Sequence, residues 1–592
     1  MKPIREWLDE LAVVPLPDHI VPTPGRGGDG TLKVGNVYLH SRYQPREEAA
    51  HRVDSAGLDL TRPVLVIGSG LGYHVVDLLD RWAEVGVIEF DPAIARLAAE
   101  GLLRDRDVLL AVGEPNAVAE SPGFLAFAER VPQLWVYPIT AQLHPEATDA
   151  MSSHVVQAAL GKKRLRIAIV GPLYGGPLPI TEYLERGFHE LGHSTLRVDN
   201  SQAWPMYEDA TKGVRSKQNA RKLGDMLAHY LCEWSYARVS EFGPDICVVM
   251  AQAPVDKMFP IRLLRDGVVS AFWYVENWRH LPYWRDIARF YDVFFHIQPG
   301  EFEEQLAQAG CPCSAFVQTG CDPEIHRSVE LDAAERDEYE CDLSFAGAGY
   351  PNRLEMFKGL TDYRFKIWGV GWSTRELAPF ACDPETRFTP ERFAKIVAGS
   401  KINLNLHSST VHDGVDPECD AINPRVFEIA ACGGFQLCDP CKGLETLFDF
   451  DTELPVYRGL AELRAKIEHF RDRPEERAVF AERARERVLA EHTYKHRAQQ
   501  MLDVIIEKYG ARLLRKGVRV QKTVAEMATQ VGRDTDLGRY LDSLPPEMLF
   551  TQANMNPHLR KPMQGLASSE KVFVYLREVR DFTETLLALK ET

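Results

Sequence analysis

The sequence contains no apolar run long enough to cross a membrane, which takes about 20 consecutive apolar residues. It has no cysteine before Cys232, and its total of eleven is odd. Scattered, unpaired cysteines in a long chain are typical of a reducing compartment rather than of a disulfide framework. The segment 1–11 predicts an amphipathic helix with acidic residues, not a signal peptide. We therefore expect a cytoplasmic protein without membrane insertion.

Positive charge is also in short supply. The chain has 69 Lys and Arg against 85 Asp and Glu, a net charge of -16. This balance argues against nucleic acid or an anionic membrane as the main partner, although a local basic pocket is still compatible with it. Low-complexity segments and internal repeats are absent as well. With 45% hydrophobic and 26% charged residues, the composition is that of an ordinary globular protein.

A chain of 592 residues is too long for one core, so several domains are expected. Apolar strands alternate with helical segments, which predicts an α/β fold with parallel sheets. We predict a Rossmann-like domain over 1–160, two further Rossmann-like lobes over 161–325 and 326–508, and a helical extension over 509–592. The helical spacing of apolar residues over 572–589 favours a packing or homo-oligomerisation role for that extension.

The most informative stretch covers residues 403–448. A short apolar strand is followed by a polar loop, and a helix begins at Pro424 and ends at Gly433 and Gly434. Another strand and another helix start come next. The ends of such strands and the starts of such helices are where open α/β sheets bind ligands.

Three carboxylates in this stretch are candidates for ligand binding. Glu428 lies on the helix, Asp420 precedes it by eight positions, and Glu445 lies at the next helix start. A carboxylate can accept two hydrogen bonds from a ribose diol, and a nearby helix N-terminus attracts phosphate. On these grounds alone, Glu428 could equally be a solvated helix residue and Glu445 an ordinary acidic residue of a first turn.

The segments PRVFEIAACGG and GLETLF in this stretch resemble the C-terminal signature of GT-B glycosyltransferases, and most closely the CgeB-like (spore-maturation type) branch. The resemblance extends to the E-x7-E motif of retaining GT-B enzymes. It implies that Glu428 holds the donor ribose and that Asp420, a shorter carboxylate, takes the place of the first Glu. It also implies donor contacts for Arg425 and Glu445. Retaining or inverting stereochemistry is left open.

A glycine-rich loop comes earlier in the same lobe. The predicted strand over 342–346 leads into Gly347 and Gly349, and Arg353 follows near a helix start. Glycines permit close approach to a phosphate, and an arginine there can pair with it. The CgeB-like pattern has a similar element, which implies donor binding by Arg353. The alternative is a surface arginine.

Two other loops are expected near the same ligand. A strand of the second lobe ends in Trp368 and Gly369, a position that lies near the donor base in GT-B enzymes. In the first lobe, Gly175 and Gly176 follow the first strand, where they would face the donor phosphates or the acceptor. A simple strand-to-helix turn accounts for these two glycines equally well.

Acid/base chemistry on the acceptor side is assigned to Glu276, which lies within the aromatic segment 272–278. His280 is a rival candidate. The aromatic rings could stack on a sugar, but a buried core is the commoner environment for such residues.

The first domain has a glycine motif of its own. An apolar strand runs into Gly68, Gly70 and Gly72, and the next strand ends at Glu89. This is the pattern of a Rossmann-like nucleoside site. It resembles motifs I and II of class I methyltransferases, and the segment 39–49 resembles part of the Maf-like flagellin-modifying proteins. The resemblance implies an S-adenosylmethionine-like ligand, while a scaffold that docks a partner is the alternative.

Two cysteine pairs have spacings seen in metal sites. These are Cys311 with Cys313, and Cys438 with Cys441. Neither has a second ligand pair at zinc-finger spacing, so we interpret them as buried or incidental thiols and predict no metal.

The resemblance thus implies a metal-independent glycosyltransferase that uses a UDP-, dTDP- or GDP-sugar. A flagellin-like protein or a surface glycan is the acceptor that family analogy alone indicates. Two alternatives stay open, methyl transfer by the first domain and a non-catalytic scaffold.

Overall fold

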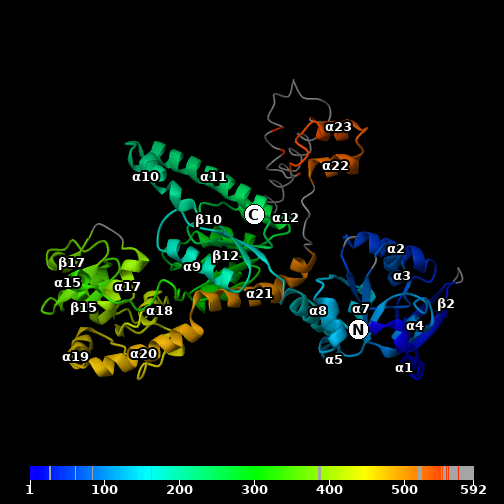
Figure 1. Cartoon of the computed structure of the whole chain (residues 1–592), viewed down its shortest axis with the longest axis horizontal. Coiled ribbons are helices and arrows are strands. Elements are labelled where there is room, and N and C mark those ends of the chain that lie inside the picture. Colours follow the sequence, from blue (N-terminus) through cyan, green and yellow to red (C-terminus); the bar gives the residue numbers. More distant parts are fainter. Residues whose placement is uncertain are drawn as a thin grey trace. The chain divides into compact units, whose positions relative to one another are not determined.

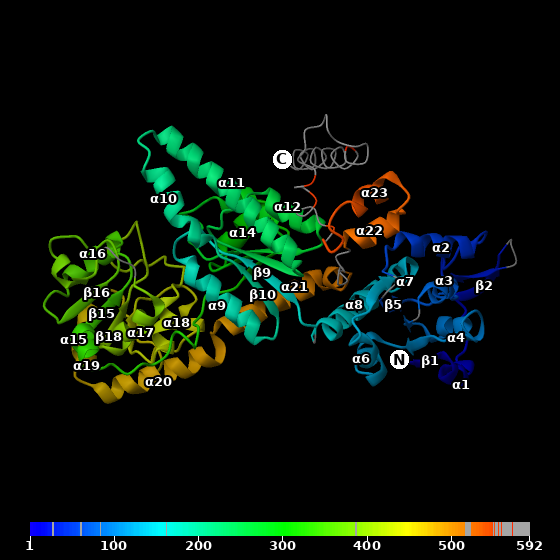
Figure 2. The same ribbon diagram turned by 45° about the horizontal axis from the view of Figure 1, so that its top comes forward.

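The computed structural model describes residues 1–25, 29–59, 62–82, 84–161, 163–384, 388–515, 523–548, 550, 555, 558 and 571. Contacts divide the chain into two compact units, one formed by Met1–Ala159 with Arg512–Thr592 and the other by Leu160–Ala511. The helix expected over 572–589 lies outside the described residues. Figures 1 and 2 show the elements of each unit in two views.

The first unit contains a five-stranded sheet of order β1-β7-β6-β5-β8, parallel except for β1 at one edge. The strands are β1 (Lys2–Pro3), β5 (Val64–Ile67), β6 (Val85–Glu89), β7 (Leu109–Val112) and β8 (Gln133–Val136). The accompanying helices are α1 (Leu8–Ala12), α2 (Pro45–Ser55), α3 (Tyr73–Arg81), α4 (Pro92–Glu100), α5 (Pro115–Ala119), α6 (Pro122–Ala128), α7 (Pro138–Leu143) and α8 (Pro145–Leu160). Strand β5 is fully buried, as a continuous apolar run predicts.

A small antiparallel sheet in this unit was not predicted. It consists of β2 (Ile20–Pro24), β3 (Gly30–Val34) and β4 (Val37–Tyr38). Prolines within β2 obscure its strand pattern, since proline cannot donate to a sheet.

The first lobe of the second unit is built on a six-stranded, fully parallel sheet of order β10-β9-β11-β12-β13-β14. Its strands are β9 (Arg166–Val170), β10 (Ser194–Val198), β11 (Ile246–Met250), β12 (Val269–Tyr274), β13 (Val293–His296) and β14 (Ser314–Phe316). Its helices include α9 (Pro177–Glu190), α10 (Trp204–Lys212), α11 (Lys217–Phe242), α12 (Met258–Arg265), α13 (Trp284–Ile287) and α14 (Glu301–Gln308).

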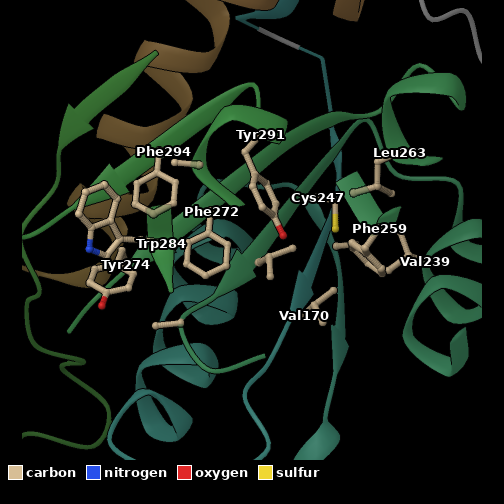
Figure 3. Packing of buried hydrophobic residues seen from close by; sticks show 14 of the residues in the cluster. Val170, Val239, Cys247, Phe259, Leu263, Phe272, Tyr274, Trp284, Tyr291 and Phe294 are labelled. Carbon is tan, nitrogen blue, oxygen red and sulfur yellow. The ribbon is translucent and has the colours of Figure 1, made fainter. Parts of the chain in front are cut away.

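The aromatic segment that could have stacked on a sugar belongs to the core of this lobe. Phe272 and Tyr274 are 2% and 0% exposed. The Phe272 ring stacks on Phe294 with centroids 5.1 Å apart, and Tyr291 packs against it edge-on (Figure 3). These rings are therefore not available to a ligand.

The second lobe has a five-stranded parallel sheet of order β17-β16-β15-β18-β19. Its strands are β15 (Cys341–Ala346), β16 (Phe365–Trp368), β17 (Ala381–Cys382), β18 (Ser400–Asn405) and β19 (Gln436–Cys438). Its helices are α15 (Ala333–Tyr339), α16 (Pro351–Lys358), α17 (Pro390–Ala398), α18 (Arg425–Ala431), α19 (Leu460–Arg471) and α20 (Pro474–Glu491).

Helix α21 (Tyr494–Arg515) connects the two lobes. The Arg497 Nε atom donates to Thr319 O at 3.0 Å, and the Tyr509 hydroxyl donates to Asp292 O at 2.7 Å. A Cβ atom on Gly187 would lie 2.5 Å from Tyr494 O, so glycine is what lets α9 approach α21.

The α/β class is confirmed, since every pairing in the three larger sheets is parallel except that of β1. Two parallel-sheet lobes joined by a returning helix form the GT-B arrangement that the sequence resembles. The described residues after 515 form α22 (Val524–Val531) and α23 (Asp536–Asp542). Within the described ranges, every helix falls short of the length and apolarity that a bilayer span requires.

Candidate functional site

A cavity of about 520 Å³ is lined by both lobes of the second unit. The first lobe contributes Gly175, Gly176 and Tyr183. The second lobe contributes residues that follow β15 and β16 or lie in β18, together with the start of α18. The cavity therefore lies at the carboxyl ends of the strands, where parallel α/β sheets bind ligands.

Two glycine loops of the second lobe pack against each other at this cavity. Gly369 has a φ of +121°, and a Cβ atom there would lie 2.4 Å from Gly347 O. A Cβ atom on Gly349 would lie 2.3 Å from Gly371 O. Gly347 and Gly369 line the cavity, whereas Gly349 and Trp368 are not among its lining residues. These glycines serve loop-to-loop contact first, and the loops then form part of the cavity wall.

Arg353 lines the cavity from the start of α16, and its guanidinium is engaged by main chain. The Nε and Nη2 atoms donate to Leu406 O at 2.9 and 2.7 Å, and Nη1 donates to Ala348 O at 3.0 Å. Burial lowers the pKa of Arg353 to about 10. The side chain thus ties the glycine loop to the end of β18.

The carboxylate of Glu428 lies in the first turn of α18 and is 5% exposed. One of its oxygens accepts a hydrogen bond from Arg425, and the other lies 3.8 Å from His326 Nε2. The Arg425 guanidinium lies 4.2 Å from the ring centroid of Phe393. The side chains of Glu428, Arg425, His326 and Phe393 all line the cavity. Its wall therefore combines a carboxylate, a guanidinium bonded to that carboxylate, and an apolar aromatic ring.

His326 was not identified from the sequence. Its Nδ1 accepts a hydrogen bond from Asp322 N at 3.0 Å, which places the proton of the neutral ring on Nε2, toward Glu428. Burial lowers its pKa, and Glu428 opposes that shift. No sequence spacing connects this histidine with α18, because the fold alone brings the two together.

An amide pair completes the polar wall. Asn423 Nδ2 donates to Asn405 Oδ1 at 2.9 Å. The Asn423 Oδ1 atom is buried and accepts no hydrogen bond from any described residue. A buried acceptor without a partner is costly, so this oxygen is a natural contact for a ligand donor.

Asp420 is not among the residues that line the cavity. Its carboxylate accepts hydrogen bonds from Arg279 Nη1 at 2.8 Å and from Gln298 Nε2 at 2.7 Å. Both partners belong to the first lobe, so this carboxylate joins the two lobes.

Glu276 lies behind the Gly175 loop. Its carboxylate accepts a hydrogen bond from Gln252 Nε2 at 2.6 Å, and a Cβ atom on Gly175 would lie 2.5 Å from Gln252 Oε1. Burial raises the pKa of Glu276. His280 is exposed. Gln252 therefore lies between Glu276 and the Gly175 loop, and neither Glu276 nor Gln252 is among the residues that line the cavity.

Glu445 lies apart from these groups. It is exposed on a 3-10 turn (Leu444–Thr446) and lines a separate surface depression with Arg487.

The glycine motif of the first unit has the expected backbone. Gly68, Gly70 and Gly72 have φ values of +100°, +48° and +93°. However, a Cβ atom on Gly68 would lie 2.0 Å from Thr140 Oγ1, and one on Gly70 would lie 2.5 Å from His40 Nε2. The loop is therefore in close contact with side chains of its own unit.

The acidic residue of this motif, Glu89, is also hydrogen-bonded within its own unit. Glu89 is 1% exposed, and one of its oxygens accepts hydrogen bonds from Ser69 N and Ser69 Oγ, both at 2.8 Å. The other oxygen accepts from Phe90 N at 2.9 Å. Burial raises the pKa of this carboxyl. Both carboxylate oxygens of Glu89 thus already accept hydrogen bonds from their own unit.

The cysteine pairs differ in their surroundings. Cys311 Sγ lies 3.4 Å from Cys313 O. Cys438 and Cys441 lie in a buried cluster with His407, Cys419 and Asp439, none of which lines the cavity.

Comparison with known proteins gives a domain match and distant structural likenesses. Residues 351–503 match the family model described as "Glycosyl transferase-like". A search of curated proteins gave no match. Solved structures similar to this chain include sucrose-phosphate synthase from Thermosynechococcus elongatus, with 12% identity, a TM-score of 0.42, and coverage of 59% of this chain and 100% of that one.

Another is HepE from Anabaena in complex with UDP and glucose, with 10% identity, a TM-score of 0.38, and coverage of 58% and 99%. A trehalose-6-phosphate protein from E. coli bound with UDP-2-fluoro glucose has 12% identity, a TM-score of 0.39, and coverage of 60% and 99%. The fold follows from the sheet topology of the chain itself. The matched residues contain Arg353, Arg425 and Glu428, and the match supports a glycosyltransferase as the class of enzyme.

Proposed function

We propose that this chain transfers a sugar from a nucleotide-sugar donor, which binds in the cavity between the two lobes of the second unit. The observation that carries the proposal is the placement of Glu428, whose carboxylate lines that cavity at the first turn of α18. A ribose diol offers two donors to such an acceptor. The position of Glu428 also matches the ribose-binding acid of the GT-B signature.

The phosphates of the donor would meet several helix starts. Helices α9, α16 and α17 each contribute first-turn or capping residues to the cavity wall, namely Gly176, Tyr350 and Pro390. Helix N-termini and Arg425 stabilise negative charge, and charge develops on the leaving diphosphate during glycosyl transfer. This mechanism needs no metal in the cavity.

The acceptor is proposed on the resemblance to CgeB-like and flagellin-modifying proteins, as a protein or a surface glycan. It would approach from the side of Gly175, where Glu276 and Gln252 form a hydrogen-bonded pair behind the loop. Burial raises the pKa of Glu276, which makes its carboxylate a stronger general base for the proton of an acceptor hydroxyl, with Gln252 between the two.

Donor binding by Glu428 can be measured by isothermal titration calorimetry with UDP, dTDP and GDP. Loss of a charged acceptor weakens a hydrogen bond by about 1.5–3 kcal/mol, so Glu428→Gln should bind the preferred nucleotide diphosphate about tenfold or more weakly. Glu482→Gln is the matched control, because Glu482 is exposed on α20 and outside the cavity.

Equal affinity of both variants would contradict the assignment of Glu428. A second assay follows hydrolysis of the matching nucleotide sugars. If the wild-type protein bound S-adenosylmethionine and no nucleotide, methyl transfer would replace the present proposal. If it bound none of these ligands, a non-catalytic scaffold would replace it.

A further inference from the structure

A cluster of metal-ligating side chains lies in the second lobe, outside the proposed donor cavity. His407 follows β18, Cys419 lies in the loop before α18, and Cys441 follows β19. Their ligand atoms all lie within 4.8 Å of one another. These residues come from three separate segments, so only the sheet topology brings them together.

One ring nitrogen of the histidine is available to a ligand. His407 is 1% exposed, and its Nδ1 lies 2.7 Å from Asp439 Oδ1. Its Nε2 is buried and has no hydrogen-bond partner among the described residues. A carboxylate on one imidazole nitrogen with the other nitrogen left open is the arrangement of metal-binding histidines, in which the carboxylate fixes ring orientation.

The two thiols are close but are not bonded to each other. Cys419 Sγ and Cys441 Sγ are 2.9 Å apart, and both cysteines are free. A zinc ion with Zn–S distances of about 2.3 Å would separate the two sulfur atoms by roughly 1 Å more. Cys438 and Asp439 form a separate second group of potential ligands with His407.

We propose that His407, Cys419 and Cys441 bind a structural zinc ion, with Asp439 positioning His407. Two thiolates and an imidazole suit zinc, whereas magnesium and calcium prefer oxygen ligands. The ion would join the loop over 406–424 to the end of β19.

This loop matters because it ends beside the donor cavity. Asn352 Nδ2 anchors its first part by donating to His407 O at 2.8 Å and to Gly414 O at 2.9 Å. Cys419 precedes Asn423 and Arg425, both of which line the cavity. A zinc ion would thus hold the second half of a segment whose first half is held by hydrogen bonds.

The test is elemental analysis of the full chain, expressed with added zinc and purified without metal-affinity resin or chelator. We expect about one zinc per chain in the wild type. In the double variant Cys419→Ser/Cys441→Ser, the zinc content should be lower by about tenfold or more. Cys341→Ser is the matched control and should retain the metal, since Cys341 is buried in the same lobe and its thiol lies 3.4 Å from the Ser400 hydroxyl, away from the proposed ligands.

A second measurement uses wild-type protein and so does not depend on the folding of a variant. Cobalt(II) added to the metal-depleted chain should produce thiolate-to-cobalt charge-transfer absorption, and zinc should abolish it. Asp439→Asn should weaken zinc binding by about tenfold if Asp439 positions His407.

A wild-type chain without metal and without the cobalt absorption would overturn the zinc site. A mass spectrum showing a Cys419–Cys441 disulfide in freshly purified protein would overturn it too. Because these readouts are metal content and absorption, they are independent of whether the cavity binds a nucleotide sugar.

Discussion

Arg353 shows how a charged side chain at a ligand cavity can be bound by the protein itself. Three of its donors bond to the carbonyls of Leu406 and Ala348, and the residue is 8% exposed. A lysine has one nitrogen where arginine has a fork of three. The contribution of Arg353 to the site is therefore first to hold two cavity-lining segments in place.

We expect Arg353→Lys to lower the free energy of unfolding by about 1–3 kcal/mol, because at least one buried carbonyl loses its donor. Urea unfolding followed by circular dichroism measures this change. Arg375→Lys is the control, since Arg375 is exposed in the same lobe. If both variants unfolded at the same urea concentration, the carbonyl-binding role would be wrong.

The three carboxylates predicted near the donor have different surroundings. Glu428 lines the cavity, Asp420 bonds to Arg279 and Gln298 of the first lobe, and Glu445 is exposed elsewhere. All three were candidates in the sequence, although only Glu428 matches a Glu of the E-x7-E motif. The direction in which a helix start faces depends on tertiary packing, which a single sequence does not display.

At the scale of elements, the cavity wall depends on the contact between the loops after β15 and β16. Gly369 combines a φ of +121° with a Cβ position 2.4 Å from Gly347 O. An L-residue there is strained by its backbone conformation and also collides with main chain, which cannot move as a flexible side chain can.

Gly369→Ala should therefore lower the free energy of unfolding by about 1–3 kcal/mol and weaken nucleotide binding, because the two loops must separate. Unfolding and calorimetric titration of the same samples provide both readings. Gly459→Ala should leave both unchanged, since Gly459 has an extended φ of 177° and a Cβ atom there would meet no atom within 4 Å. Normal stability and affinity in Gly369→Ala would contradict the proposed loop contact.

At the scale of the whole molecule, stability should depend on histidines that are buried in the neutral form. Burial lowers the pKa of His74, His296 and His492 to about 4 in each case. Each folded-state pKa lies below the unfolded value of about 6.5. Between these values the unfolded chain binds more protons than the folded chain does. The stabilisation from the neutral histidines is therefore fully present above about pH 6.5 and decreases as the pH falls toward 4.

His296 allows a direct test. It is 0% exposed, its ring nitrogens accept and donate no hydrogen bond within the described ranges, and Glu303 Oε1 lies 3.5 Å from Nε2. His296→Phe removes the proton uptake and retains an aromatic ring beside Phe302 and Phe316. From pH 7.5 to 5.5, the wild type should lose about 1 kcal/mol more than the variant.

Thermal unfolding across this pH range measures the difference, with the two proteins compared at each pH. Parallel pH profiles would show that His296 does not take up a proton on unfolding.

Much of the sheet architecture could be predicted. Strands such as β11 and β12 are continuous apolar runs because parallel strands are buried on both faces. The glycine loops were also recognised from local sequence, because glycine adopts backbone conformations that other residues rarely adopt. By contrast, the 26-residue helix α11 was not among the predicted elements, and strand β2 was obscured by its prolines.

Local chemistry along the chain was thus enough to determine the α/β class, the parallel strands, the glycine turns and the helix that carries Glu428. These features depend on hydrophobic periodicity and backbone freedom, which neighbouring residues determine. Tertiary structure decided that His326 faces Glu428, that Glu89 is satisfied by Ser69, and that His407 meets Cys419 and Cys441. Such pairings join segments far apart in the chain, and only the packing of sheets and loops sets which side chains converge.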